Sequence, residues 1–180
     1  MQYSGVYDGL CGGPTAPKDG GLLKYFLDTE FIESGRFAGI QLVSIGIVAE
    51  DGREFYAISS DFDAATASQW VVDNVLANLD PDVARLPVCR IADDVRAFVD
   101  GDPEPQFWAY YADYDWVVFC QMFGTMMDLP KGFPMYCRDI KQWCDQLGNP
   151  DLPKQGEGEH NALADAYWNR SAWNFLNGGA

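Results

Sequence analysis

The sequence predicts an α/β fold in which helices flank a mixed β-sheet. Three strand-like runs come first, and two of them meet around the dipeptide Asp51-Gly52, which is a strong hairpin signal. Segments with helical spacing then alternate with further strand-like runs, an order typical of layered α/β proteins. With 180 residues, 48% of them hydrophobic, the chain is long enough to bury a substantial core.

The three N-terminal strands are recognised by short apolar runs. The first is expected over residues 22–30, where the apolar run ends in Asp-Thr-Glu. The second, over residues 40–50, is rich in β-branched side chains, and the third covers residues 53–59. Because a tight turn joins the last two, we expect these strands to be mostly antiparallel.

Helical spacing of apolar residues dominates the rest of the chain. Residues 135–140 are read either as a short strand or as the lead-in to the following helix. The same spacing places most tryptophans, Trp70 among them, in the core. The predicted order is helix 65–79, helix 91–101, aromatic strand 106–112, helix 113–124, segment 135–140, helix 140–148, and a glycine-containing loop that leads into a terminal helix over 156–176.

The chain is expected to consist of an arm and one domain. Residues 1–21 are rich in Gly and Pro and show no periodicity, so we read them as an extended arm, with a single domain over residues 22–180. No apolar run approaches the ~20 residues that span a bilayer, and no basic segment precedes an apolar stretch at the N-terminus. These features predict a cytoplasmic protein (host cytoplasm if the protein is viral) that does not contact a membrane.

The charge excludes some classes of function. Twelve Lys and Arg against 27 Asp and Glu give a net charge of −15. This charge argues against a broad basic surface that binds long duplex DNA. It leaves open contact with nucleic acid through metal ions bound to carboxylates, because each divalent ion reverses the local field. The five cysteines form no C-x-x-C pair, which argues against a disulfide framework or a zinc ribbon.

Two acids stand side by side at the end of the first strand. Asp28 and Glu30 flank Thr29, and alternate residues of a strand project from the same face, so the two carboxylates are roughly 6–7 Å apart. They repel each other unless a cation lies between them. The pair therefore indicates either a divalent metal site or a strand that has simply reached solvent.

Two further groups of polar residues follow along the chain. Asp113 and Asp115 open a predicted helix, where acids favour the helix dipole and Asp113 is a suitable N-cap. His160, the only histidine, precedes Asp165 by five residues. Positions five apart do not share a helix face, so His160 is expected in the entry loop and Asp165 in the helix.

Taken together, these acids predict a two-metal centre. Four carboxylates can hold two Mg²⁺ or Mn²⁺ ions about 4 Å apart, which stabilise the attacking and leaving oxygens of a phosphodiester. A histidine, which changes charge near neutral pH, can accept a proton from the attacking water.

The motifs Asp28-Thr29-Glu30, Tyr114-Asp115 and His160-x₄-Asp165 resemble those of the DEDD superfamily of 3′–5′ exonucleases, in the branch with a histidine general base. The similarity covers about residues 22–176 and is greatest to the small bacterial exoribonucleases related to ribonuclease T and oligoribonuclease. It implies a ribonuclease H-like fold with a mixed five-stranded sheet, order 3-2-1-4-5, strand 2 antiparallel. It also implies two divalent metal ions, and it allows a homodimer.

The resemblance assigns roles residue by residue. It implies that the metal ligands are Asp28, Glu30, Asp115 and Asp165, and that His160 is the base. Substrate contacts are expected at Thr29, Phe31, Tyr111 and Tyr114, with Phe31 either stacking on a terminal base or packing in the core. Many family members have Asn four residues before the middle Asp, where this chain has Tyr111. That departure leaves Asp113 as a rival to Asp115.

The resulting hypothesis is a metal-dependent 3′–5′ exonuclease acting on the 3′ end of single-stranded RNA or DNA, with RNA favoured. An alternative with the same chemistry is a phosphodiesterase for short or signalling oligonucleotides, which the acidity also fits. An alternative of a different class is a non-catalytic acidic decoy or interaction protein on the same scaffold.

Overall fold

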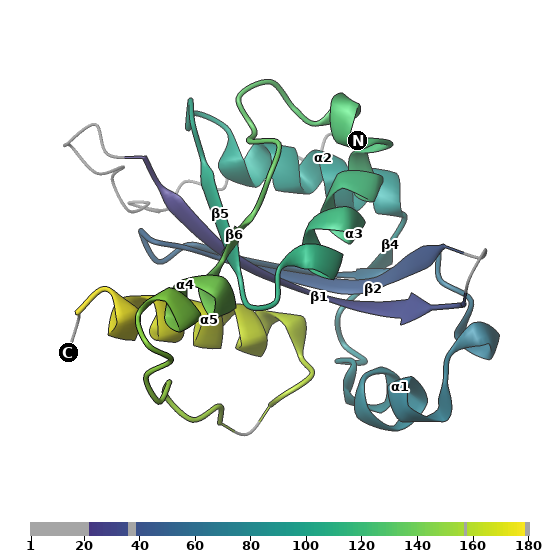
Figure 1. The fold of residues 1–180 in the computed structure, drawn as a ribbon. Helices are drawn as coiled ribbons and strands as arrows, with labels where there is room; N and C mark the ends of the chain where they lie inside the picture. Colours follow the sequence, from purple (N-terminus) through teal and green to yellow (C-terminus); the bar gives the residue numbers. More distant parts are fainter. Residues whose placement is uncertain (1–21, 36–38, 157, 179–180) are drawn as a thin grey trace, which may run out of the picture.

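The computed structural model describes residues 22–35, 39–156 and 158–178, so the predicted arm at residues 1–21 lies outside the described residues. Six strands form one sheet in the order β4-β3-β2-β1-β5-β6, with helices on both faces (Figure 1). The strands are β1 (Lys24–Glu33), β2 (Ile40–Ala49), β3 (Glu54–Ser59), β4 (Arg85–Leu86), β5 (Gln106–Ala109) and β6 (Arg138–Asp139).

The predicted fold class and strand order are confirmed. The expected order 3-2-1-4-5 corresponds to β3-β2-β1-β5-β6, and β2 is antiparallel to both of its neighbours. Gly52 has φ +93°, as the predicted hairpin turn requires. The expected count of five strands is wrong by one, because β4 pairs in parallel with the outer edge of β3. Two residues carry no period-2 pattern, so this strand leaves no trace in the sequence.

Helices cover the two faces of the sheet with separate cores. In Figure 1, α2 and α3 lie on one side of the sheet, and α4 and α5 lie on the other. The first face packs on Tyr25 and Leu27, and the second packs on Phe26, so the faces follow the alternation of β1. The helices are α1 (Gln69–Asn74), α2 (Val88–Val99), α3 (Asp113–Phe123), α4 (Ile140–Gln146) and α5 (Ala162–Leu176). None of the described helices is long and apolar enough to cross a membrane.

The single helix predicted over residues 65–79 is wrong. The chain forms a 3₁₀ turn, then α1, then a second 3₁₀ turn over Leu76–Asn78. Ser68 interrupts the run, because its side chain accepts the N–H of Val71 and caps a new helix there. Trp70 is 55% exposed, so its predicted place in the core is also wrong.

A small apolar cluster lies beneath α1 and is separate from the cores under the other helices. Three buried side chains form its centre, and partly buried neighbours surround them. We call this set the α1 cluster: Ile32, Val43 and Val75, with Phe62, Ala67, Val71, Leu76 and Leu79 around them.

Close contact between α5 and the sheet depends on one glycine. Gly46 of β2 pairs with Asp28 of β1. A Cβ atom built on Gly46 would lie 2.3 Å from the carbonyl oxygen of Ala162 and 2.4 Å from the nitrogen of Leu163. Only glycine therefore allows the first turn of α5 to rest directly on the strand beside Asp28.

We predict that Gly46→Ala displaces the start of α5 and lowers the free energy of unfolding by about 1–3 kcal/mol, the usual cost of overpacking. Denaturant unfolding measures the loss. Gly156→Ala is the matched control, because a Cβ there meets no atom within 4 Å, and it should change stability by less than about 0.5 kcal/mol. Equal stability of the Gly46 variant and wild type would contradict the proposed close contact.

Candidate active site

Three of the predicted carboxylates converge on the α5 face of the sheet. Asp28 and Glu30 project from the same face of β1, and Asp165 faces them from the first turn of α5. One oxygen from each of the three lies within 4.8 Å of the others. The chain thus brings Asp165 together with two acids that lie more than 130 positions earlier in the sequence.

Asp115 lies next to this cluster but is held from the other face of β1. Its Oδ1 accepts two hydrogen bonds from Thr29, one from the backbone N–H at 2.9 Å and one from the hydroxyl at 2.6 Å. Asp115 is 6% exposed and Thr29 is 4% exposed. Thr29 is therefore placed to position Asp115, with its hydroxyl already engaged.

The rival acid on the same helix is placed differently. Asp113 is exposed, whereas Asp115 is buried against β1. The predicted N-cap role of Asp113 is wrong, because α3 begins at Asp113 and its N-cap is Ala112, which makes no side-chain cap bond. The two acids are two residues apart, roughly half a helical turn, so Asp113 is directed at solvent and Asp115 at the site.

Two side chains form hydrogen bonds with the backbone of β1 beyond the point where β5 stops pairing with it. β5 pairs with β1 only as far as Phe26. Beyond that point, the Nδ2 of Asn169 donates to the carbonyl of Leu27 at 2.8 Å, and Asp115 accepts the N–H of Thr29. Asn169 was missed in the sequence. It lies four residues after Asp165, on the same face of α5, and that spacing is a signal that could have found it.

His160 enters the site from the loop before α5, as predicted. Its backbone N–H donates to Oδ2 of Asp165 at 3.0 Å, and its φ is +68°. Its ring packs edge-on against Trp70 with 4.8 Å between the ring centroids. The α5 helix begins only after it, at Ala162, with Asn161 as N-cap. The backbone of His160 is thus held by Asp165 of α5, and its ring contacts Trp70 of α1.

The segment before His160 is also tied to α5. Gln155 donates from its side chain to Oδ1 of Asp165, and the indole N–H of Trp168 donates to the carbonyl of Pro153 at 2.9 Å. Gln155 was not recognised in the sequence, because a lone glutamine in a loop carries no pattern. Both oxygens of Asp165 therefore accept hydrogen bonds from this loop.

Burial, together with repulsion among some of the acids, raises the pKa values of the cluster. Burial, then the negative charges of Asp115, Glu30 and Asp165, raise the pKa of Asp28 well above its usual range. Burial, then Asp165 and Asp115, raise the pKa of Glu30 to about 8. Burial raises the pKa of Asp115 and of Asp165 to about 6, although the hydrogen bonds from Thr29, His160 and Gln155 oppose the rise.

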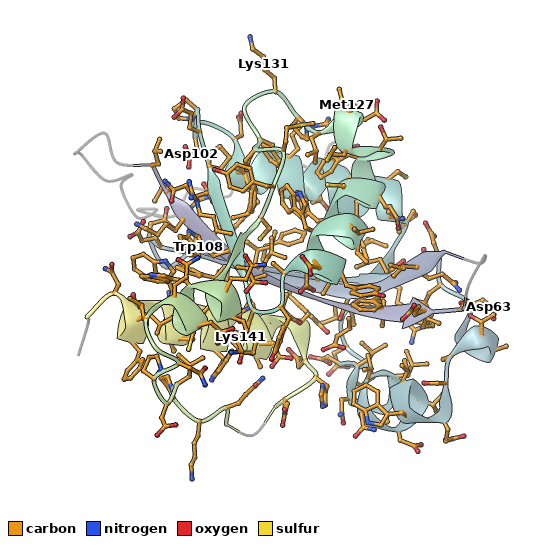
Figure 2. The ribbon with its side chains drawn as sticks, viewed as in Figure 1. Asp63, Asp102, Trp108, Met127, Lys131 and Lys141 are labelled. Carbon is orange, nitrogen blue, oxygen red and sulfur yellow. The ribbon has the colours of Figure 1, made fainter. Side chains whose placement is uncertain are left out.

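These residues fit a divalent cation. Hard cations such as Mg²⁺ and Mn²⁺ prefer carboxylate oxygens, and three such oxygens converge here. The ion pairs formed by the described residues use other acids: Lys141 of α4, labelled in Figure 2, pairs with Asp145. The cluster could therefore hold a metal ion, whose positive charge would offset the negative charge of the carboxylates.

Two cavities open beside the carboxylates. One, of about 130 Å³, is lined by Asp28, His160 and Asp165, with Tyr110, Gln155, Glu159, Trp168 and Asn169 around them. The other, of about 400 Å³, is lined by Glu30, Phe31, Glu33 and residues of the α1 segment, Ser68, Trp70, Val71 and Val75. Asp28 and Asp165 thus border the cavity next to α5, and Glu30 borders the cavity next to α1.

Aromatic side chains surround these cavities. The ring of Phe31 stacks on that of the exposed Tyr114, at 5.6 Å between centroids, so Phe31 both packs on the protein and borders the larger cavity. Tyr111 is 63% exposed and lies beside Tyr110. Together with the exposed Trp70, which was expected in the core, they provide stacking surfaces around the site.

Comparison with known proteins places the chain among nucleases. The family model for the 3′–5′ exoribonuclease Rv2179c-like domain matches residues 23–177. The 3′–5′ exoribonuclease Rv2179c of Mycobacterium tuberculosis is 42% identical over 148 residues, which cover 80% of this chain and 87% of that protein.

Solved structures share the fold. The Mg²⁺- and Mn²⁺-bound form of S. pombe Pop2p has a TM-score of 0.58 at 13% identity, over 86% of this chain and 81% of that one. The zinc-bound complex of E. coli exonuclease I with single-stranded DNA has a TM-score of 0.61 at 13% identity, over 87% and 40%.

The raised pKa values predict how stability depends on pH without metal. The unfolded chain ionises these carboxyls near pH 4, while the folded chain keeps protons up to about pH 8 at Glu30. The folded state binds more protons in this window, so the protonated carboxyls contribute fully to stability below pH 4, and this contribution is lost as the pH rises towards 8. At pH 8 in EDTA, the free energy of unfolding of Glu30→Gln should therefore exceed that of wild type by about 1–3 kcal/mol.

The measurement is denaturant unfolding in EDTA at pH 4, 6 and 8. At pH 4 the two proteins should differ little, because the Glu30 carboxyl keeps its proton in the folded state. Added Mn²⁺ should stabilise wild type more at pH 8 than at pH 5, since protons compete with the metal. A Glu30→Gln variant less stable than wild type at pH 8 in EDTA would argue against the buried, repulsive site.

Proposed function

The chain belongs to the Rv2179c-like 3′–5′ exoribonuclease family, and from this premise we propose that it is a divalent-metal-dependent 3′–5′ exonuclease that hydrolyses single-stranded nucleic acid, with RNA favoured. The observation that carries the proposal is the convergence of Asp28, Glu30 and Asp165, with oxygens within 4.8 Å of one another. The name of the mycobacterial relative supports RNA as substrate.

The carboxylates would hold two Mg²⁺ or Mn²⁺ ions, with Asp28, Glu30 and Asp165 as direct ligands and Asp115 as the fourth acid. Bound metal would polarise the phosphodiester and stabilise charge on the attacking and leaving oxygens. Thr29 contributes by fixing the orientation of Asp115 through its N–H and hydroxyl. Such support for a ligand typically matters for metal affinity as much as for geometry.

His160 acts as the general base in this proposal. His160 lines the cavity that Asp28 and Asp165 also line, so a water molecule bound there would be close to this residue. The backbone bond to Asp165 and the edge of Trp70 restrict the position of the ring. This restraint supports transfer of a proton from the attacking water to one ring nitrogen.

The larger cavity is the site proposed for the 3′-terminal nucleoside. Its volume of about 400 Å³ falls within the usual range for small ligands, and Phe31 and Trp70 provide apolar walls next to Glu30. A terminal nucleoside seated there brings its phosphate to the carboxylates. This arrangement favours a free 3′ end over an internal position in a duplex.

The acidity of the chain favours short substrates as a second candidate. A net charge of −15 repels long polyanions, and few phosphate contacts give a weak dependence on salt. A phosphodiesterase for di- and short oligonucleotides uses the same residues in the same roles. The two candidates differ only in how rate depends on substrate length.

The test is degradation of 5′-labelled oligonucleotides of two to twenty nucleotides, as RNA and as DNA. We predict stepwise loss of 3′ nucleotides with Mn²⁺ and none with EDTA. Asp115→Asn should reduce activity by about 10³-fold or more, because it removes a proposed ligand, whereas Asp113→Asn on the same helical turn should stay within about twofold. Tight binding without products would reject the enzyme and favour a decoy, and the reverse ranking of the two aspartates would reject the ligand assignment.

His160→Ala should lower kcat by roughly 10²–10⁴-fold, the usual contribution of a positioned base. The rise in melting temperature caused by Mn²⁺ should remain, because the four carboxylates are intact. Single-turnover kinetics at saturating metal measure the first effect, and thermal denaturation measures the second. Activity within about threefold of wild type would assign proton transfer to another group.

A further inference from the structure

Tyr111 has a backbone conformation that is unfavourable for tyrosine. Its φ is +56°, in the left-handed region that glycine and asparagine adopt more easily than bulky residues. The conformation is fixed by its surroundings, because the N–H of the next residue, Ala112, donates to Oδ2 of Asp139 at 2.9 Å. The backbone conformation at position 111 is therefore unfavourable for the tyrosine found there.

Burial of the side chain does not compensate for this conformation. Tyr111 is 63% exposed, and its aromatic neighbour is Tyr110, at 4.7 Å between ring centroids. A tyrosine kept in a strained conformation with most of its ring in solvent contributes little to packing. Strain of this kind near an active site points to a role in function.

The position of the ring relates it to the proposed site. Tyr110 packs against Trp168 at 4.9 Å between centroids, and both line the cavity that contains Asp28 and Asp165. Tyr111 contacts Tyr110 and so continues this aromatic row. The larger cavity, with Phe31 and Trp70, borders the carboxylates on the α1 side instead.

We propose that Tyr111 is a substrate-binding residue that stacks on the base next to the 3′-terminal nucleotide. The inference rests on the proposed function. With the terminal nucleoside in the larger cavity and its phosphate at the carboxylates, the strand continues on the other side, where the exposed ring of Tyr111 stands. An aromatic face in this position binds any base, because every base offers a flat apolar surface.

The experiment compares Tyr111→Asn with Tyr111→Phe on a single-stranded oligoribonucleotide and on the same strand with an abasic penultimate nucleotide. Asparagine accepts the left-handed backbone but has no ring, so its melting temperature should equal or exceed that of wild type. We expect Tyr111→Asn to lower kcat/KM about tenfold, mainly through KM, and Tyr111→Phe to stay within about twofold of wild type.

The abasic substrate separates stacking from a structural effect. Wild type should lose about tenfold on it, while the Asn variant should lose little more, because the two changes remove the same interaction. An Asn variant within twofold of wild type on the normal strand, or one that loses as much as wild type on the abasic strand, would overturn the inference. If wild type degrades neither strand with Mn²⁺, the proposed function itself fails, and this inference fails with it.

Discussion

The active site depends on how the free edge of β1 is completed. Beyond Phe26, none of the strands that the structure describes pairs with β1 on the β5 side, yet Leu27 and Thr29 are buried there and their backbone groups need partners. α3 supplies the carboxylate of Asp115 to Thr29, and α5 supplies the amide of Asn169 to Leu27. Helices from opposite faces of the sheet thus contact the same stretch of strand, and these contacts place their acids, Asp115 and Asp165, beside the two acids of β1.

The same arrangement explains why the site is electrostatically costly in the absence of metal. Four acids gather at a place chosen by backbone hydrogen bonding and packing, so their mutual repulsion is not relieved by local rearrangement. The close approach at Gly46 fixes the first turn of α5, which carries Asp165, against β2. The side chains that complete the edge of β1 therefore also concentrate negative charge beside it, and a bound cation would neutralise this charge.

Much of the fold could be predicted because β1, β2 and β3 are long and strongly patterned, with a clear turn at Gly52. The shared face of Asp28 and Glu30 followed from strand alternation alone. The pairing of Asp115 with Thr29 could not be predicted, because it depends on where β5 departs from β1. The same holds for Trp70, since helical spacing does not reveal that Ser68 starts a new helix and turns the indole outwards. Motif order along the chain, rather than any single motif, led to the prediction that His160 and Asp165 belong to the site.

The α1 cluster gives the α1 segment a stability of its own. Its apolar contacts are separate from the cores under α2, α3 and α5, so opening this segment leaves the sheet and the carboxylates in place. Amide hydrogens of α1 should consequently exchange with solvent through local opening, faster than those of β1 and β2. Each opening carries Trp70 away from His160 and exposes one wall of the larger cavity. If the larger cavity holds the terminal nucleoside as proposed, the lifetime of this contact sets how long the nucleoside stays enclosed, so that its release depends on a few aliphatic side chains rather than on the carboxylates.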